Sequence, residues 1–331
     1  MNSSGRHRKL SRRDPSSIRP VQGEWDSASY FPKNKELFLF KGANLALNLG
    51  LSIMFGLLTA TGFGTADFLA KLCTNRIGFL RTALFMQLIG SLFVLPFAVP
   101  DASRLITQPW AVLGGILVGV ANALATLFLY KGFEVGRLSI VSPIASTAPV
   151  VAILLAIAFL GESLTVERFS AISLVVIGII LVSVQAGGED FSKQITSGTI
   201  YALGFMLLGG LVLFGLKPVS NALGVFLPVL IIRWVGVFIL AAPLVAQRLK
   251  VVTSGAFRLI VAVAFFDTFA NVAYNLGVTH GTVTIVSPLG GMFSAVTVLL
   301  ACIFLKEKLS RHQVLGFIAI CIGVGMLGIF G

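Results

Sequence analysis

The chain has 331 residues, of which 56% are hydrophobic and only 11% are charged, and its mean hydropathy is +0.95. A soluble globular domain carries roughly a quarter charged residues, so this composition excludes an ordinary water-soluble protein and requires a lipid bilayer as the solvent for most of the chain. The net charge of +12 gathers in the N-terminal tail and beside apolar segments, which is typical of membrane anchoring and argues against a nucleic-acid partner.

Residues 1–46 form a polar, basic N-terminal tail that holds nine of the 25 Lys and Arg residues. The tail shows no hydrophobic periodicity, and we expect it to be largely disordered. It has no apolar stretch near Met1, so it is not an ordinary cleaved signal peptide. Its Ser- and Arg-rich start resembles an organelle transit peptide, but a plain cytosolic tail is the interpretation we favour.

Ten apolar segments follow the tail, each close to the about 20 residues that a membrane-spanning helix needs. A β-barrel would instead show shorter stretches of alternating polarity. The polar interval 187–197 divides the ten segments into five plus five. The sequence therefore predicts an all-α integral membrane protein with ten transmembrane helices, organised as repeat 1 (47–186), a linker (187–197) and repeat 2 (198–331). The ten segments are 47–70, 79–99, 110–130, 138–160, 169–186, 198–216, 222–246, 257–279, 282–305 and 313–330.

The two halves of the chain are related by an internal duplication. Residues 136–164 match residues 281–309 at 13 of 29 positions when shifted by 145. The matches include a Gly, a Ser-Pro pair and a Glu at the same spacing, which apolar composition alone would not align. The first two segments of each half correspond at an offset of 146, where the aligned pairs are Phe68/Phe214, Lys71/Lys217, Asn75/Asn221, Gly78/Gly224 and Gly90/Gly236.

An odd number of segments in each repeat has a geometric consequence. The second repeat enters the membrane from the opposite side to the first, so the two repeats are inverted relative to one another. Two inverted halves can exchange conformations and thereby open a central site to either side of the membrane in turn. The duplication therefore favours a transporter over a channel.

Several short motifs give the chain a resemblance to a known family. Gly-Glu-Ser-Leu at 161–164 and Lys-Glu-Lys-Leu at 306–309 precede the fifth segment of each half, and Phe63–Lys71 reads FGTADFLAK, with Phe63 where the family usually has Trp. Together with the helix count, these motifs resemble the EamA-type branch of the drug/metabolite transporter superfamily over about residues 50–331. The resemblance implies a fold and a transporter role, but it does not imply a particular substrate.

Polar residues inside the apolar segments are candidates for a substrate site, because charged groups there are costly. Two stripes occupy equivalent positions in the two repeats, each on one helix face. We expect both stripes to line a central cavity and bind substrate, although hydrogen-bonding between helices is an alternative that does not exclude this role. The stripes are Asn122, Thr126 and Tyr130 in the third segment, and Asp267, Asn271, Tyr274 and Asn275 in the eighth.

Three further charged or polar positions extend this candidate site. We expect Asp267 to couple transport to a proton or another cation, with Asp67 as the second candidate; an ion pair between Asp67 and Lys71, four residues apart, is the structural alternative. Arg233 lies deep in the seventh segment, and its counterpart in repeat 1 is Gln87. Arg233 binds an anionic group of the substrate or pairs with Asp267, and the sequence leaves both interpretations open.

Ser142 and Pro143 in the fourth segment recur as Ser287 and Pro288 in the ninth. Proline removes a backbone donor from a helix, and paired interruptions of this kind often mark transporter sites. We therefore expect interrupted helices there, although a proline near a helix N-terminus is the simpler alternative. Glu162 and Glu307 lie at helix ends, where we expect a structural or gating role.

The sequence predicts a secondary active transporter, an exporter or exchanger, for a small polar or amphipathic metabolite in the plasma membrane or an organelle envelope. An intramembrane enzyme and a channel or scaffold are the alternatives. No catalytic set is evident, no Walker-type motif for ATP occurs, and we expect no cofactor. The three cysteines and three histidines lack metal-ligand spacing, so we expect no metal site.

Overall fold

The computed structural model describes residues 32–135, 141, 144–183, 191–246, 255–305 and 311–330. The chain divides into two compact units, Met1–Asn44 and Leu45–Gly331, and the following description concerns the second. The described part is helical, without a strand. Its elements are α1 (Pro32–Ile77), α2 (Phe79–Ala98), η1 (Val99–Asp101), α3 (Arg104–Thr107), α4 (Pro109–Val135), α6 (Ala148–Leu160), α7 (Val166–Ser183), α8 (Phe191–Leu223), α9 (Phe226–Ala246), α10 (Phe257–His280), α11 (Val283–Gly290), α12 (Phe293–Leu305) and α13 (Arg311–Phe330).

The described residues of the ten predicted segments are helical apart from short breaks at residues 146–147, 224–225, 282 and 291–292. The main difference lies at the start of α1, which begins at Pro32 and not near Leu47. Residues 32–46, assigned to the tail from the sequence, are therefore helical, while residues 1–31 lie outside the described part. The predicted linker 187–197 is described only from Phe191 onward, where α8 begins before the expected residue 198.

Two glycines at equivalent positions separate the first two helices of each repeat. Gly78 has φ of 85° and Gly224 has φ of 84°, a conformation that side-chain-bearing residues rarely adopt. Gly78 stands between α1 and α2, and Gly224 between α8 and α9. The repeated glycine thus encodes a repeated turn.

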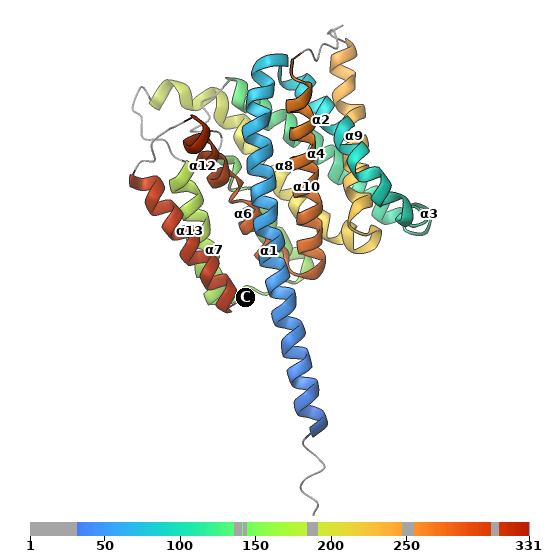
Figure 1. The fold of residues 1–331 in the computed structure, drawn as a ribbon, viewed down its shortest axis with the longest axis vertical. Helices are drawn as coiled ribbons and strands as arrows, with labels where there is room; N and C mark the ends of the chain where they lie inside the picture. Colours follow the sequence, from blue (N-terminus) through green and yellow to red (C-terminus); the bar gives the residue numbers. More distant parts are fainter. Residues whose placement is uncertain are drawn as a thin grey trace, which may run out of the picture. The chain divides into compact units, whose positions relative to one another are not determined.

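The two repeats are inverted, as packing between corresponding helices demonstrates. A Cβ atom added to Gly90 of α2 would lie 3.0 Å from Nε of Arg233 in α9, and one on Gly236 would lie 2.7 Å from Nε2 of Gln87. The residue numbers therefore increase along α2 where they decrease along α9, so the two helices are antiparallel. In Figure 1 they lie beside one another.

The last helices of the two repeats pack in the same way. A Cβ atom on Gly178 of α7 would lie 2.7 Å from Cγ1 of Ile320 in α13, and one on Gly323 would lie 2.7 Å from Cγ2 of Val175. Figure 1 shows α7 and α13 side by side. Small residues that allow close helix approach are typical of membrane interfaces. Corresponding helices that run antiparallel place the two repeats in opposite orientations.

The outer surface and helix lengths fit a bilayer. Five described helices are long and apolar enough to cross a membrane, at Leu47–Thr74, Phe79–Asp101, Pro109–Gly132, Gly198–Leu223 and Phe257–His280. Shorter apolar helices occur at Ala148–Leu160, Phe226–Ala242, Val283–Thr297 and Val314–Gly323. Large apolar side chains remain exposed around these helices, Leu92, Leu117, Phe159, Phe238 and Phe304 among them. In water such a surface would be unfavourable, whereas in lipid it needs no cover.

The ninth apolar segment is broken into two helices. α11 ends at Gly290, the turn residues Gly291 and Met292 follow, and α12 begins at Phe293. The predicted interruption is present, but it falls after Pro288, at two successive glycines, which are poor residues for a helix interior. In repeat 1, Ser146 and Thr147 form the equivalent turn before α6. The predicted interruption at Ser142 and Pro143 lies outside the described residues.

Candidate substrate cavity

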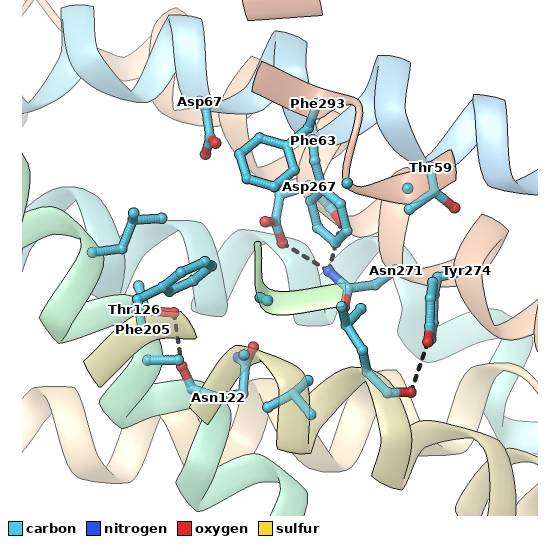
Figure 2. A pocket seen from close by; sticks show the side chains of 18 of the residues that line it. Thr59, Phe63, Asp67, Asn122, Thr126, Phe205, Asp267, Asn271, Tyr274 and Phe293 are labelled. Atoms are coloured by element: carbon cyan, nitrogen blue, oxygen red, sulfur yellow. Dashed lines mark hydrogen bonds between the residues drawn. The ribbon is translucent and has the colours of Figure 1, made fainter. Parts of the chain in front are cut away.

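A cavity with about 930 Å³ of empty volume, including its open mouth, lies among helices of both repeats. Figure 2 shows the side chains that surround it. The lining residues are Thr59, Phe63 and Asp67 of α1; Met86 of α2; Asn122, Ala125, Thr126, Leu129 and Tyr130 of α4; Ala148 and Pro149 of α6; Phe205, Gly209, Val212, Leu213 and Leu216 of α8; Asp267, Asn271 and Tyr274 of α10; and Gly290, Gly291 and Phe293 near the break between α11 and α12.

The structure brings the two predicted polar stripes to this one cavity. Asn122, Thr126 and Tyr130 line it from α4, and Asp267, Asn271 and Tyr274 line it from α10. Asp67 joins them from α1. The other predicted positions, Asn275, Arg233, Gln87, Ser287 and Pro288, are not among the lining residues.

Arg233 pairs with Asp267 behind the cavity wall. Its guanidinium donates to the Asp267 carboxylate, to Oγ1 of Thr268 over 3.1 Å, and to Oε1 of Gln87 over 2.8 Å. The Arg233 side chain is only 2% exposed, whereas that of Asp267 is 18% exposed. Of the two interpretations left open for Arg233, the structure contains the ion pair, which neutralises the charge of Asp267.

Asp67 has different surroundings. Its side chain is partly buried and reaches the cavity, as Figure 2 shows. Among the described residues it forms neither a hydrogen bond nor a salt bridge, so the alternative of an ion pair with Lys71 is absent. Among the described lining residues, Asp67 is therefore the carboxyl group that pairs with no cation.

Part of the α10 stripe serves to hold helices together. The Tyr274 hydroxyl donates to the backbone oxygen of Leu213 over 2.7 Å and lies 2.7 Å from Oγ of Ser287. Asn275 is fully buried and donates through Nδ2 to the Val225 oxygen over 2.8 Å. Ser287 thus anchors Tyr274, and Asn275 fastens α10 to the start of α9. The cavity-lining and helix-linking interpretations both apply to this stripe.

The two helix breaks meet at the cavity wall. A Cβ atom on Gly291 would lie 2.7 Å from Cγ of Pro149. Pro149 opens α6 just after the repeat-1 turn, and Gly291 stands in the repeat-2 turn. Both residues line the cavity. Irregular backbone at membrane depth is tolerated where it lines a cavity in this way.

A second ion pair links the repeats away from the lining residues. Nζ of Lys217 donates to Oε1 of Glu162 over 2.7 Å and to the Gly281 oxygen over 3.0 Å. Glu162 also accepts from the backbone N–H of Val283 over 3.0 Å and of Thr284 over 2.9 Å, at the N-terminus of α11. We call these residues the Glu162–Lys217 cluster.

The cluster favours the ionised form of Glu162. Burial works against ionisation of this carboxyl group, but the hydrogen bonds from Lys217, Thr284 and Val283 outweigh it and lower the pKa of Glu162 below its ordinary value. The helix N-terminus adds favourable partial charge. This carboxylate, expected from the sequence to be structural or gating, joins a loop of repeat 1 to a helix of repeat 2. Its counterpart Glu307 lies outside the described residues.

Sequence reasoning missed several lining side chains, among them Thr59, Met86, Phe205 and Phe293. These residues are apolar or weakly polar within apolar segments, so no local signal sets them apart from lipid-facing neighbours. Phe63 was noticed as part of a motif but not as a lining residue. In the described part of the chain, no group of three or more His, Cys, Asp or Glu residues could hold a metal ion.

Two inverted five-helix repeats that surround a cavity with polar stripes define a multi-pass membrane transporter. The EamA-like transporter family matches this chain twice, over residues 50–184 and 196–329. The chain belongs to this family, whose members are transporters and not enzymes. The two matches fall one on each repeat.

Two further comparisons agree with the fold. An uncharacterised protein of Methanocaldococcus jannaschii is 30% identical over 133 residues, which are 40% of this chain and 96% of that protein. That archaeal protein is therefore about as long as one repeat. A solved crystal structure superposes with a TM-score of 0.71 at 16% identity, covering 84% of this chain and 96% of the other. At that identity the likeness concerns the fold.

Proposed function

We propose that this protein is a secondary active transporter that exports or exchanges a small polar or amphipathic metabolite by alternating access. The observation that carries the proposal is the cavity between inverted repeats, lined from α4 and α10 by side chains at equivalent positions. Inverted repeats around a midplane site are the arrangement on which alternating access depends.

The lining supports an amphipathic solute. Aromatic side chains contribute large apolar surfaces, while carboxyl and amide groups provide fixed polar contacts. The aromatic residues are Phe63, Tyr130, Phe205, Tyr274 and Phe293, and the carboxyl and amide residues are Asp67, Asn122, Asp267 and Asn271. A mostly apolar pocket with a few placed polar groups is the usual form of a small-molecule site.

We assign coupling to a proton or another cation to Asp67 in place of Asp267. Asp267 is engaged by Arg233 and by Nδ2 of Asn271 over 3.2 Å, and so acts as a fixed counter-ion. Asp67 has no such partners among the described residues, so a cation that reaches the cavity finds its carboxyl group available. This assignment replaces our expectation from sequence alone.

Reconstituted vesicles test the function. Vesicles containing the protein are loaded with a mixture of amines, amino acids, sugars and nucleosides, and mass spectrometry follows their loss with and without a pH gradient. We expect saturable efflux of a restricted set of solutes, with exchange accelerated by the same solute outside. Ion conductance without saturation would indicate a channel and contradict the proposal.

A variant assigns the coupling role. In Asp67→Asn, we expect accumulation driven by the pH gradient to be lost, because the amide keeps the shape but does not titrate. Wild-type pH dependence in this variant would remove Asp67 from the coupling role. For the cell, we propose the plasma membrane, which microscopy of a fluorescent fusion would distinguish from an organelle envelope.

A further inference from the structure

We propose, building on the transport function above, that the solute is a monovalent organic ammonium ion with an apolar or aromatic body. Asp67 holds its ammonium group, and the rings of Phe63, Phe205 and Phe293 surround its apolar part. The inference follows from the charge of the cavity, from the hydrogen-bonding capacity of its walls and from the distribution of its aromatic side chains.

The described cavity wall carries a net negative charge when Asp67 is ionised. Two aspartates, Asp67 and Asp267, line it, and no Lys, Arg or His is among the described lining residues. Arg233 neutralises Asp267 from behind, which leaves the charge of Asp67 uncompensated. A monovalent cation restores neutrality at this site. An unpaired charge in a low-dielectric site is costly, so electrostatics favours such a ligand.

The hydrogen-bonding capacity of the walls is biased toward acceptors, because the hydroxyl donors are already engaged. In the described part of the wall, the four hydroxyl groups each donate to the protein itself: Thr59 to the Phe55 oxygen, Thr126 to the Asn122 oxygen, Tyr130 to Sδ of Met86, and Tyr274 to the Leu213 oxygen. A ligand therefore cannot rely on hydroxyl donors in this cavity.

The lining amides strengthen this bias. Nδ2 of Asn271 donates to the backbone oxygen of Asp267 over 2.8 Å and to its carboxylate, so the Asn271 side chain offers its Oδ1 as an acceptor. The amide of Asn122, which has no hydrogen bond in the described structure, keeps both kinds of group. With the Asp67 carboxylate, the wall offers mainly acceptors, which suits the N–H donors of an ammonium group.

The aromatic residues complete the selection. Figure 2 shows Phe63 and Phe293 near both Asp67 and Asp267, with Phe205 across the cavity. Aromatic faces attract cations and accommodate flat apolar groups. A carboxylate on the ligand would instead meet Asp67 and Asp267. Arg233, whose guanidinium would balance that carboxylate, is 2% exposed and bound to Asp267, Gln87 and Thr268. Amino acids and organic anions are therefore disfavoured.

Calorimetric titration of the purified full-length protein in detergent tests this selectivity with four matched probes. They are 2-phenylethylamine, 2-phenylethanol, phenylacetate and phenylalanine, which share a ring and differ in charge. We expect the amine to bind at least about tenfold more tightly than the other three, because hydrogen bonds between charged groups are stronger than those between neutral groups. Tighter or equal binding of phenylalanine or phenylacetate, or no binding of the amine, would overturn the proposal.

Variants locate the binding group. Asp67→Asn should weaken binding of 2-phenylethylamine by about tenfold or more, whereas Asp67→Glu should retain most of it. Asp101→Asn, in the partly exposed Asp101–Arg104 pair outside the cavity lining, is the matched control and should bind as the wild type does. Unchanged affinity in Asp67→Asn, or loss in Asp67→Glu with a normal melting temperature, would overturn the role of Asp67. Saturable vesicle flux of other solutes would still uphold transport if the amine failed to bind, so the two proposals fail separately.

Discussion

The two repeats pack alike but carry different chemistry. Gly64 of α1 lies against Val296 of α12, and at the equivalent place Gly210 of α8 lies against Val151 of α6. At the polar positions the repeats diverge: Gln87 and Asn122 in repeat 1 correspond to Arg233 and Asp267 in repeat 2, and Asp67 corresponds to Leu213. These packing positions are symmetric, whereas the charged positions at and behind the cavity wall are not.

The comparison separates two demands on one fold. Exchange of conformations between inverted repeats needs equivalent contacts on both sides, which the glycine and valine pairs supply. Recognition of a solute without such symmetry needs a polar group on one side of the cavity, and Asp67 supplies it. At the position of the Arg233–Asp267 ion pair in repeat 2, repeat 1 has two neutral amides, Gln87 and Asn122.

The largest expected effect on stability comes from removing the carboxylate of Asp267. Asp267→Asn leaves the buried guanidinium of Arg233 without its counter-ion, and arginine cannot escape by losing its proton. We expect a loss of about 3–5 kcal/mol in the free energy of unfolding, as for other buried pairs that lose one partner. Thermal or denaturant unfolding in detergent measures it.

A double variant provides the control for that prediction. Asp267→Asn combined with Arg233→Gln places in repeat 2 the amide pair that repeat 1 carries at Gln87 and Asn122. Without a buried charge, the double variant should recover most of the lost stability. A single variant as stable as the wild type would show that the ion pair is not a structural necessity.

The Glu162–Lys217 cluster should make stability depend on pH. The pKa of the Glu162 carboxyl group is lower in the folded protein than in the unfolded chain, where it is about 4.3. Ionised Glu162 therefore stabilises the fold at pH values above about 4.3. This contribution disappears as the pH falls through the folded pKa. Glu162→Gln should cost about 2 kcal/mol at pH 7, the scale of hydrogen bonds to charged groups.

Melting temperatures across pH 7 to pH 3 check this prediction. The gap between wild type and Glu162→Gln should stay constant down to about pH 5 and close at lower pH. Glu167→Gln, at an exposed position in the first turn of α7, is the matched control and should change stability much less, because solvent screens its charge. A gap that is independent of pH would assign the effect to packing and not to charge.

A smaller effect tests the symmetry of the packing. Gly64→Ala and Gly210→Ala should each destabilise the protein by about 1 kcal/mol, because overpacking exceeds the helix propensity that alanine gains. The added Cβ atoms would lie 2.6 Å from Cβ of Val296 and 2.5 Å from Cβ of Val151. Gly50→Ala, with no atom within 4 Å of its Cβ, should be neutral or stabilising. Unequal effects at Gly64 and Gly210 would break the proposed equivalence.

Sequence patterns predicted the helices and the stripes because both depend on local periodicity. The face shared by Asp267, Asn271 and Tyr274 follows from helical spacing, and that face does line the cavity. The choice between the two interpretations of Arg233, a pair with Asp267 or an anionic group of the substrate, did not follow, because periodicity gives the direction of a side chain on its own helix and not the neighbouring helix that it meets.

The remaining differences have a similar cause. Helix α11 continues through Pro288 and ends at Gly290, three residues beyond Ser287. It ends there because Gly290 and Gly291 are poor residues for a helix interior. Phe205 and Phe293 lie in uniformly apolar segments, where nothing in the sequence separates a cavity wall from a lipid-facing surface. Asp267 pairs with Arg233 and Asp67 does not. This difference depends on contacts between helices, which the sequence pattern does not give.

The most direct test of alternating access is the reactivity of a single cavity cysteine from each side of the membrane. The three native cysteines are replaced by alanine, Thr126 of the cavity wall is changed to cysteine, and membrane-impermeant maleimide is applied to right-side-out and to inside-out vesicles. Because inverted repeats exchange conformations, we predict labelling in both vesicle orientations. Labelling in only one orientation would mean that the cavity opens to a single side, which would contradict the account.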